Sequence, residues 1–221
     1  MATIQQKGNC YLCGTELGKV AMKNHMLKLH SDPTGDQECC LIKVEGMDKR
    51  YWLLLDAPTT ASLKNLDDFL RKIWLECCGH MSAFMGSGYR EYPMSRKLSA
   101  FPEGAQIGYE YDFGDTTQLQ VSFVGQTRRK KQREAVRLLA RNKPIEWKCA
   151  KCGAPAELVD VEDMFGEEPS CYCKACAEKS EVDMDMTLPI TNSPRMGVCA
   201  YTGELDKYQY TPEKFKKGAA K

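Results

Sequence analysis

The placement of cysteine and histidine constrains this chain more than any other feature. Twelve of its 221 residues are cysteine. Cys10-x2-Cys13-x11-His25-x4-His30 has the spacing of a Cys-Cys-His-His zinc finger, one residue short of the usual twelve between the two pairs. Two thiolates and two imidazoles complete the tetrahedron that Zn²⁺ takes, and a segment this short buries too little apolar surface to fold without metal. We therefore predict a zinc finger over residues 1–32.

A second set of cysteines has the spacing of a zinc ribbon. Cys149-x2-Cys152 is followed, after twenty residues, by Cys173-x2-Cys176. Cys171 is a further candidate, because Cys171, Cys173 and Cys176 compete for two ligand positions, but the two-residue spacing favours Cys173. We expect residues 147–203 to hold this ribbon and a C-terminal core segment in which Cys199 is buried and unliganded. The prediction is two Zn²⁺ ions per chain, each closed by four protein ligands and therefore structural.

Composition indicates where such a chain would work. The sequence is 43% hydrophobic and 28% charged, with a net charge of +1. It has no apolar run long enough to cross a membrane and no apolar signal core at its start. These features predict a soluble, cytoplasmic protein. In a reducing compartment, paired cysteines are more often metal ligands than disulfides.

The central part of the chain predicts an antiparallel sheet. Gln106–Val124 contains two runs that alternate with period two around the turn Phe113-Gly114-Asp115-Thr116, which indicates a β-hairpin. Glu38–Val44 and Tyr51–Asp56 read as two more strands. The residues expected on the buried face of the hairpin are Ile107, Tyr109, Tyr111, Phe113, Leu119, Val121 and Phe123.

One long helix is expected to pack on this sheet. Apolar residues recur at helical spacing over Leu63–Cys78, with hydroxyl side chains before it and Gly79 after it. Residues 128–139 could form another helix by propensity. The predicted fold class is α+β, a central antiparallel sheet with one long packed helix over residues 38–146, flanked by the two zinc modules.

Several segments together resemble a known family. The run Ile42-Lys43-Val44, then Tyr51-Trp52, then a helix with Trp74 and His80, then the sequence YEYDFGD at 109–115, is similar to the Ri-plasmid open-reading-frame-three-like family, whose members are associated with mobile elements. The resemblance covers residues 41–125, and Asn192–Cys199 looks like the tail of zinc-bearing members. It implies a fold rather than an activity, and it implies that Val136–Arg141 is a strand. Leu66-Asp67 stands where the family often has Leu-His.

A candidate cleft follows from the same region. His80, Asp112 and Asp115 could meet across the sheet and either bind a metal or perform acid–base chemistry. The adjacent pairs Cys39-Cys40 and Cys77-Cys78 fit buried structural roles better, because free cysteine packs as a small hydrophobe.

The neutral net charge conceals two opposed blocks. Residues 126–152 hold ten Lys or Arg against two Glu, and residues 153–185 hold ten Asp or Glu against two Lys. A basic block can form a nucleic-acid surface, but the acidic block could fold back through Glu157–Asp163 and mask it. A basic tail is expected over residues 204–221. The candidate nucleic-acid-binding residues are Arg128, Arg129, Lys130, Lys131 and Arg133.

The sequence therefore favours a zinc-binding adaptor that contacts nucleic acid or a protein partner, with structural zinc. A pure protein-interaction module, and an enzyme that uses His80, Asp112 and Asp115, are the alternatives. No phosphate loop, nucleophile elbow or HExxH motif is present, so a small-molecule substrate is not expected.

Overall fold

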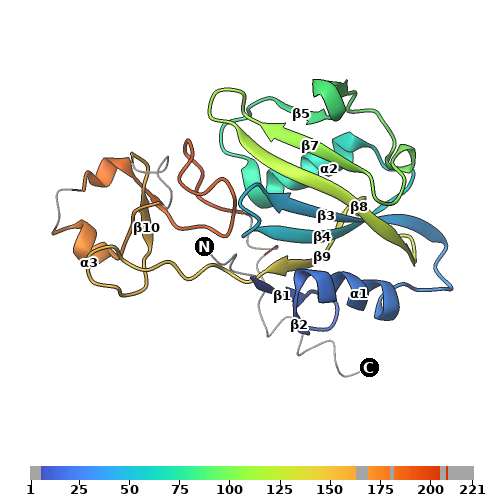
Figure 1. Ribbon diagram of the computed structural model, residues 1–221, viewed down its shortest axis with the longest axis horizontal. Coiled ribbons are helices and arrows are strands. Elements are labelled where there is room, and N and C mark those ends of the chain that lie inside the picture. The colour runs from blue at the N-terminus through green and yellow to red at the C-terminus, as the bar shows by residue number, and fades with distance from the viewer. Residues whose placement is uncertain (1–5, 163–168, 180–181, 205–207, 209–221) are drawn as a thin grey trace.

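The computed structural model describes residues 6–162, 169–179, 182–204 and 208. Apart from Glu204 and Tyr208, the predicted basic tail lies outside these residues. The chain forms a large sheet with helices, and a smaller module at one end of the molecule (Figure 1). In the described parts of the chain, no helix is both long and apolar enough to span a membrane.

Nine strands of the described chain form one sheet in the order β2-β1-β9-β4-β3-β8-β7-β5-β6, and every neighbouring pair is antiparallel. The predicted α+β class is confirmed. The strands are β1 (Lys7–Cys10), β2 (Glu16–Gly18), β3 (Gln37–Gly46), β4 (Trp52–Pro58), β5 (Ser82–Met85), β6 (Glu91–Tyr92), β7 (Gln106–Tyr111), β8 (Thr117–Arg129) and β9 (Arg137–Asn142).

The predicted hairpin is the pair β7–β8, which closes at Tyr111 opposite Thr117. Its alternating apolar residues are buried from Ile107 to Tyr111 and from Leu119 to Phe123. Phe113 is the exception, because it is 51% exposed. Asp112 adopts a left-handed backbone with φ of 66° and accepts a hydrogen bond from the Gly114 N–H, so the alternation stops before Phe113.

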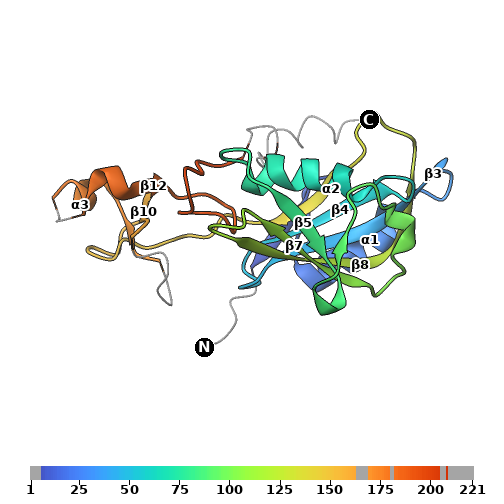
Figure 2. The same ribbon diagram turned by 90° about the horizontal axis from the view of Figure 1, so that it is seen from above.

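The centre of the sheet is covered on both faces. Leu53 and Leu55 of β4 pack in the main apolar cluster with α2 (Leu63–Leu70), whereas Trp52 and Leu54 pack with α1 (Lys19–Leu29). Figure 2 shows the two helices on opposite sides of the sheet. This arrangement explains why all seven residues of β4 are buried.

The long helix starts as expected but ends early. Ser62 and Asn65 form a reciprocal capping box at the start of α2. The helix continues as a π-helical turn, η1 (Arg71–Leu75), and the backbone becomes extended at Glu76. The prediction of a helix to Cys78 is therefore wrong. The wider π turn ends the hydrogen-bonded helix and leaves Cys77 and Cys78 in the loop that follows.

The strand predicted at Val136–Arg141 is confirmed as β9, and the helical alternative is not. β9 pairs with β4 on one side and with β1 of the finger on the other. Cys10, Met22 and Met26 of the finger share an apolar cluster with Trp52 of the sheet. The finger is thus continuous with the central sheet in both hydrogen bonding and packing.

The smaller module, called the ribbon module (residues 147–190), contains a second sheet in the order β11-β10-β12. Met196, in the C-terminal segment that follows the module, packs against Val159 and Cys171, and the Arg50 guanidinium lies 5.3 Å from the centre of the Trp147 ring. The module therefore touches the turn between β3 and β4. Its elements are β10 (Leu158–Asp160), β11 (Cys171–Tyr172), α3 (Lys174–Ala177), η4 (Met184–Met186) and β12 (Thr187–Pro189), and the core adds the short helices η2 (Ser87–Tyr89) and η3 (Leu98–Ala100).

Candidate metal centres

Three groups of cysteine and histidine come together among the described residues, and in each group the donor atoms lie within 4.8 Å of one another. Tetrahedral zinc with ordinary bond lengths would separate two sulfurs by about 3.8 Å and a sulfur from a nitrogen by about 3.5 Å. The groups are the finger cluster (Cys10, Cys13, His25, His30), the ribbon cluster (Cys149, Cys152, Cys173, Cys176) and the third cluster (Cys77, Cys78, His80, Cys199).

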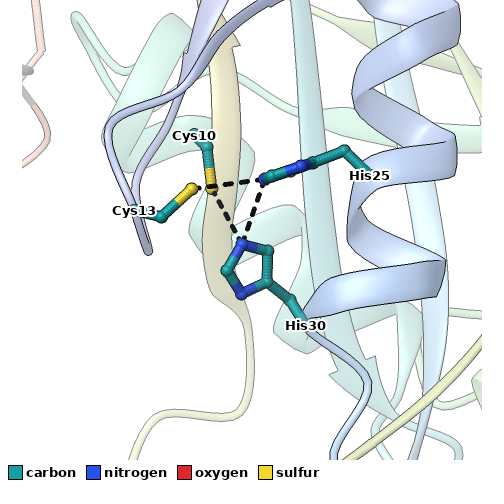
Figure 3. A group of neighbouring side chains, drawn as sticks. All are labelled: Cys10, Cys13, His25 and His30. Atoms are coloured by element: carbon teal, nitrogen blue, oxygen red, sulfur yellow. Dashed lines mark hydrogen bonds between the residues drawn. The ribbon is translucent and has the colours of Figure 1, made fainter.

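The finger cluster joins a strand end to a helix (Figure 3). Cys10 ends β1, and Gly14, with φ of 79°, allows the turn that follows Cys13. Nε2 of His30 lies 3.5 Å from Sγ of Cys10, and Nε2 of His25 lies 3.3 Å from Sγ of Cys13. The two Nε2 atoms are 3.1 Å apart. These separations are close to those of the edges of a zinc tetrahedron.

Burial sets the protonation of one finger ligand in the absence of metal. Burial raises the pKa of Cys10 to about 11, so at neutral pH its thiol stays protonated unless a cation displaces the proton. Zinc does so, because metal binding to cysteine releases protons.

The ribbon cluster lies on two turns. Gly153, with φ of 73°, closes the first turn, and its N–H donates to the Cys149 carbonyl. Sγ of Cys152 and Sγ of Cys173 are 3.8 Å apart. The backbone N–H of Cys173, together with those of Cys152 and Lys151, lowers the pKa of Cys149 to about 6, so this thiol is ionised at neutral pH.

The structure also decides between Cys171 and Cys173. Cys171 lies in β11, is 2% exposed and packs with Val159 and Met196. Cys173 instead faces the other three thiols of the ribbon cluster. Residues two apart in a strand share a face, but β11 ends at Tyr172, so the two cysteines point to different sides.

The third cluster was not predicted as a unit. Cys77, Cys78 and His80 follow η1, and Cys199 comes from the far end of the described chain. Sγ of Cys78 and Nε2 of His80 each lie 3.6 Å from Sγ of Cys199. The expectation that Cys199 is buried and unliganded is wrong on burial, because Cys199 and Cys78 are exposed. By contrast, Cys39 and Cys40 are buried, as predicted.

A signal for this cluster existed in the sequence. Cys77-Cys78-x-His80 offers three donors in four residues, and Cys199 is one of the six cysteines that the finger and the ribbon leave unassigned. The apolar stripe of the helix concealed it, because Cys77 falls in phase with that stripe.

Only part of the predicted cleft forms. His80 Nε2 lies 3.4 Å from Oδ2 of Asp112, but Asp115 contributes its backbone carbonyl, which accepts a hydrogen bond from Arg195. The fully buried Arg195 also donates to Asp112 Oδ2 at 2.6 Å. This hydrogen bond lowers the pKa of Asp112, which makes the carboxylate a weak base. Sequence reasoning missed Arg195.

One of the five candidate nucleic-acid-binding residues of the basic segment is buried. Arg129 is 3% exposed, lies 3.5 Å from Asp56 and donates to the carbonyls of Glu134 and Ala135, so it cannot reach a phosphate. The remaining four are exposed: Arg128, Lys130, Lys131 and Arg133.

Acidic residues do lie beside this segment, but they are not those expected. Asp36 accepts a hydrogen bond from the Lys131 N–H, and Glu38 lies 3.9 Å from Arg128. Glu157 of the acidic block instead lies 3.7 Å from Lys174 within the ribbon module, and Asp163 is outside the described residues. Both views place the ribbon module and the end of β8 toward opposite ends of the long axis (Figures 1 and 2).

Comparisons with known proteins add little to this description. No family model matches the chain, and no curated protein matches it. A crystal structure of a protein of unknown function from Methanosarcina mazei Go1 is 18% identical, with a TM-score of 0.38 over 47% of this chain and 67% of that one. A likeness at this level supports no argument about either fold or function.

Proposed function

We propose that this protein is a zinc-stabilised adaptor whose metal ions are structural and whose basic segment contacts duplex nucleic acid. The observation that carries the proposal is the composition of the clusters. Each offers four protein donors, which fill a zinc tetrahedron and leave no position for a substrate or a reactive water. Metal in such sites holds the chain in shape.

The same reasoning disfavours an enzyme centred on His80. Its ring nitrogen faces Cys199 as well as Asp112, and Asp112 is engaged by Arg195. A carboxylate whose pKa is lowered by an arginine is poorly suited to accept a proton at neutral pH.

The basic segment supports the choice of partner. Arg128, Lys130, Lys131 and Arg133 are exposed on one short stretch, next to the end of the finger. Asp32 N–H donates to the Arg128 carbonyl, so the end of the finger lies directly beside the basic segment. Asp36 and Glu38 offset part of the positive charge, and we therefore infer weak, sequence-independent binding through phosphates, with a Kd of about 10⁻⁴ to 10⁻⁶ M at physiological salt.

Titration of a labelled DNA duplex at low and at physiological salt tests this proposal. Replacing Arg128, Lys130, Lys131 and Arg133 by Ser should abolish binding, whereas the pair Asp36→Asn and Glu38→Gln should tighten it. Arg129 is left intact because it is buried. Binding by the wild type should weaken steeply as salt rises, because each phosphate contact releases counterions.

A matched control separates a local surface from net charge. Arg90, Lys97, Lys148 and Lys179 are also exposed, and replacing these four by Ser removes the same charge elsewhere. This variant should bind like the wild type. If it loses binding as fully as the first variant, the contact is not local. If no variant binds even at low salt, nucleic acid is excluded and a protein partner becomes the function to test.

We also retain the resemblance of residues 41–125 to the Ri-plasmid open-reading-frame-three-like family as a proposal. It would associate the chain with mobile elements, where a weak, general affinity for DNA has an obvious use.

A further inference from the structure

We propose that the third cluster is a zinc site that clasps the C-terminal segment, residues 192–201, onto the sheet and thereby fixes the position of the ribbon module. The chain would then hold three zinc ions rather than the two that the sequence predicts. This inference does not depend on the proposed contact with nucleic acid.

The donor geometry is the first argument. Both measured separations at Cys199 Sγ, to Cys78 Sγ and to His80 Nε2, are 3.6 Å. They match the edges of a zinc tetrahedron, at about 3.8 Å and 3.5 Å, as well as those in the two predicted clusters do. A disulfide between Cys78 and Cys199 would need the sulfurs to approach to about 2.05 Å and would leave Cys77 and His80 without a role.

A buried hydrogen-bond donor beside one of the ligands is the second argument. Nη2 of Arg195 lies 3.4 Å from Sγ of Cys77, and this guanidinium is fully buried. A fixed donor of this kind beside a ligand is the usual outer-shell support of a metal site.

The backbone gives a third argument. Cys199 has φ of 54°, a left-handed conformation that is unfavourable for a residue with a side chain. Such local strain persists where other interactions over-determine the conformation. Here it turns the thiol toward Cys78 and His80, and a bond to metal supplies the missing interaction.

The contacts of the segment define what the clasp would do. The Ser193 hydroxyl donates a hydrogen bond to the Trp74 carbonyl at 2.6 Å, and the Trp74 indole N–H donates to the Asn192 carbonyl. The segment therefore packs alongside η1. On its other side, Met196 packs against Val159 and Cys171 of the ribbon module. A metal ion bound to Cys199 would therefore fix the segment that contacts both the sheet and the ribbon module.

Metal content tests the site. The full chain, purified without chelator, should contain three zinc ions by elemental analysis, and both Cys78→Ser and Cys199→Ser should contain two. Cys40→Ala is the matched control, because Cys40 is buried in the main apolar core and belongs to none of the three clusters, and it should keep three. Two ions in the wild type, unchanged in both serine variants, would overturn the proposal, as would a Cys78–Cys199 disulfide in the protein under reducing conditions.

Hydrogen exchange tests the clasp. In Cys199→Ser, amides of residues 193–201 should exchange at least about tenfold faster than in the wild type, while those of β3 and β8 keep their protection. If Cys199→Ser contains two zinc ions but its amides at 193–201 exchange as slowly as in the wild type, the metal site is supported and its role in holding the segment is ruled out. Because the DNA titration uses other residues, failure here is distinguishable from failure of the proposed function.

Discussion

At the scale of single residues, Asp67 is a buried carboxylate that contacts four other polar side chains. It is 1% exposed and accepts hydrogen bonds from Tyr109 at 2.7 Å and from Ser82 at 2.6 Å. Lys64 and Arg71 form ion pairs with the same carboxylate. This one residue ties α2 and η1 to strands β5 and β7.

Replacing Asp67 by Asn should destabilise the protein by about 3 kcal/mol. The amide nitrogen of Asn would face hydrogen-bond donors, and the cations Lys64 and Arg71 would lose their buried negative partner. Urea unfolding measures the change. Asp68→Asn is the matched control, since Asp68 is the next residue, half-exposed, and paired with the same Lys64. It should cost less than about 1 kcal/mol. Equal losses in the two variants would show that Asp67 is not a hub.

The difference in stability between the wild type and the Asp67→Asn variant should depend on pH. Burial alone would raise the pKa of Asp67, but hydrogen bonds from Ser82, Lys64 and Tyr109 outweigh it and the pKa is lowered. A carboxylate with a lowered pKa stabilises the fold fully above its unfolded value of about 3.9, and the stabilisation is lost as the pH falls through the folded value. The difference between the two proteins should therefore shrink below about pH 4, while a constant difference would contradict this assignment.

At the scale of elements, periodicity predicted the hairpin, the flanking strands and the start of α2, because one-sided burial leaves alternation or a helical stripe in the sequence. It failed where the backbone departs from the period. The π turn at Arg71–Leu75 and the left-handed Asp112 have no such signature, so Cys77 and Phe113 were misplaced. The metal clusters followed the same division: the ligands of the finger and the ribbon, which have standard spacings, were predicted, and the third cluster, which joins His80 to Cys199 119 residues later, was not.

The union of finger and sheet leads to a prediction at this scale. A Cβ added at Gly8 would lie 2.2 Å from the Arg141 carbonyl and 2.5 Å from the Trp52 ring, whereas one at Gly18 would meet nothing within 4 Å. Gly8→Ser should therefore separate β1 from β9 and cost about 2 kcal/mol, or about 4–8 °C in melting temperature for a chain of this size.

Gly18→Ser is the control within the same finger, and it should be neutral or slightly stabilising because serine is a good helix N-cap. If both variants melt like the wild type, the finger contributes nothing to the sheet. The sequence alone predicts that result, because the zinc-finger motif indicates that residues 1–32 form a module separate from the sheet.

At the scale of the whole molecule, we expect the clusters to divide the chain into parts whose folding depends on metal and one part whose folding does not. The sheet between α1 and α2 has a large apolar core of its own, whereas the ribbon module buries only small apolar clusters around its cysteines. A small module with so little core needs its metal to fold.

Removing metal with a chelator should therefore unfold the protein in part. Amides of β10, β11 and residues 193–201 should lose protection from hydrogen exchange, while β3, β4, β7 and β8 keep most of theirs. Far-ultraviolet circular dichroism should retain most of its β signal. Complete unfolding on chelation would show that the metal also holds the central sheet together.

The pairing of β1 with β9 has a consequence for a chain made without zinc. With the finger unfolded, β9 becomes an edge strand that presents unpaired backbone groups along a stretch whose residues Leu138 to Asn142 are all buried in the folded protein. An open strand edge of this kind is a template for another copy of the chain. Zinc starvation would then appear as aggregation before it appeared as lost binding.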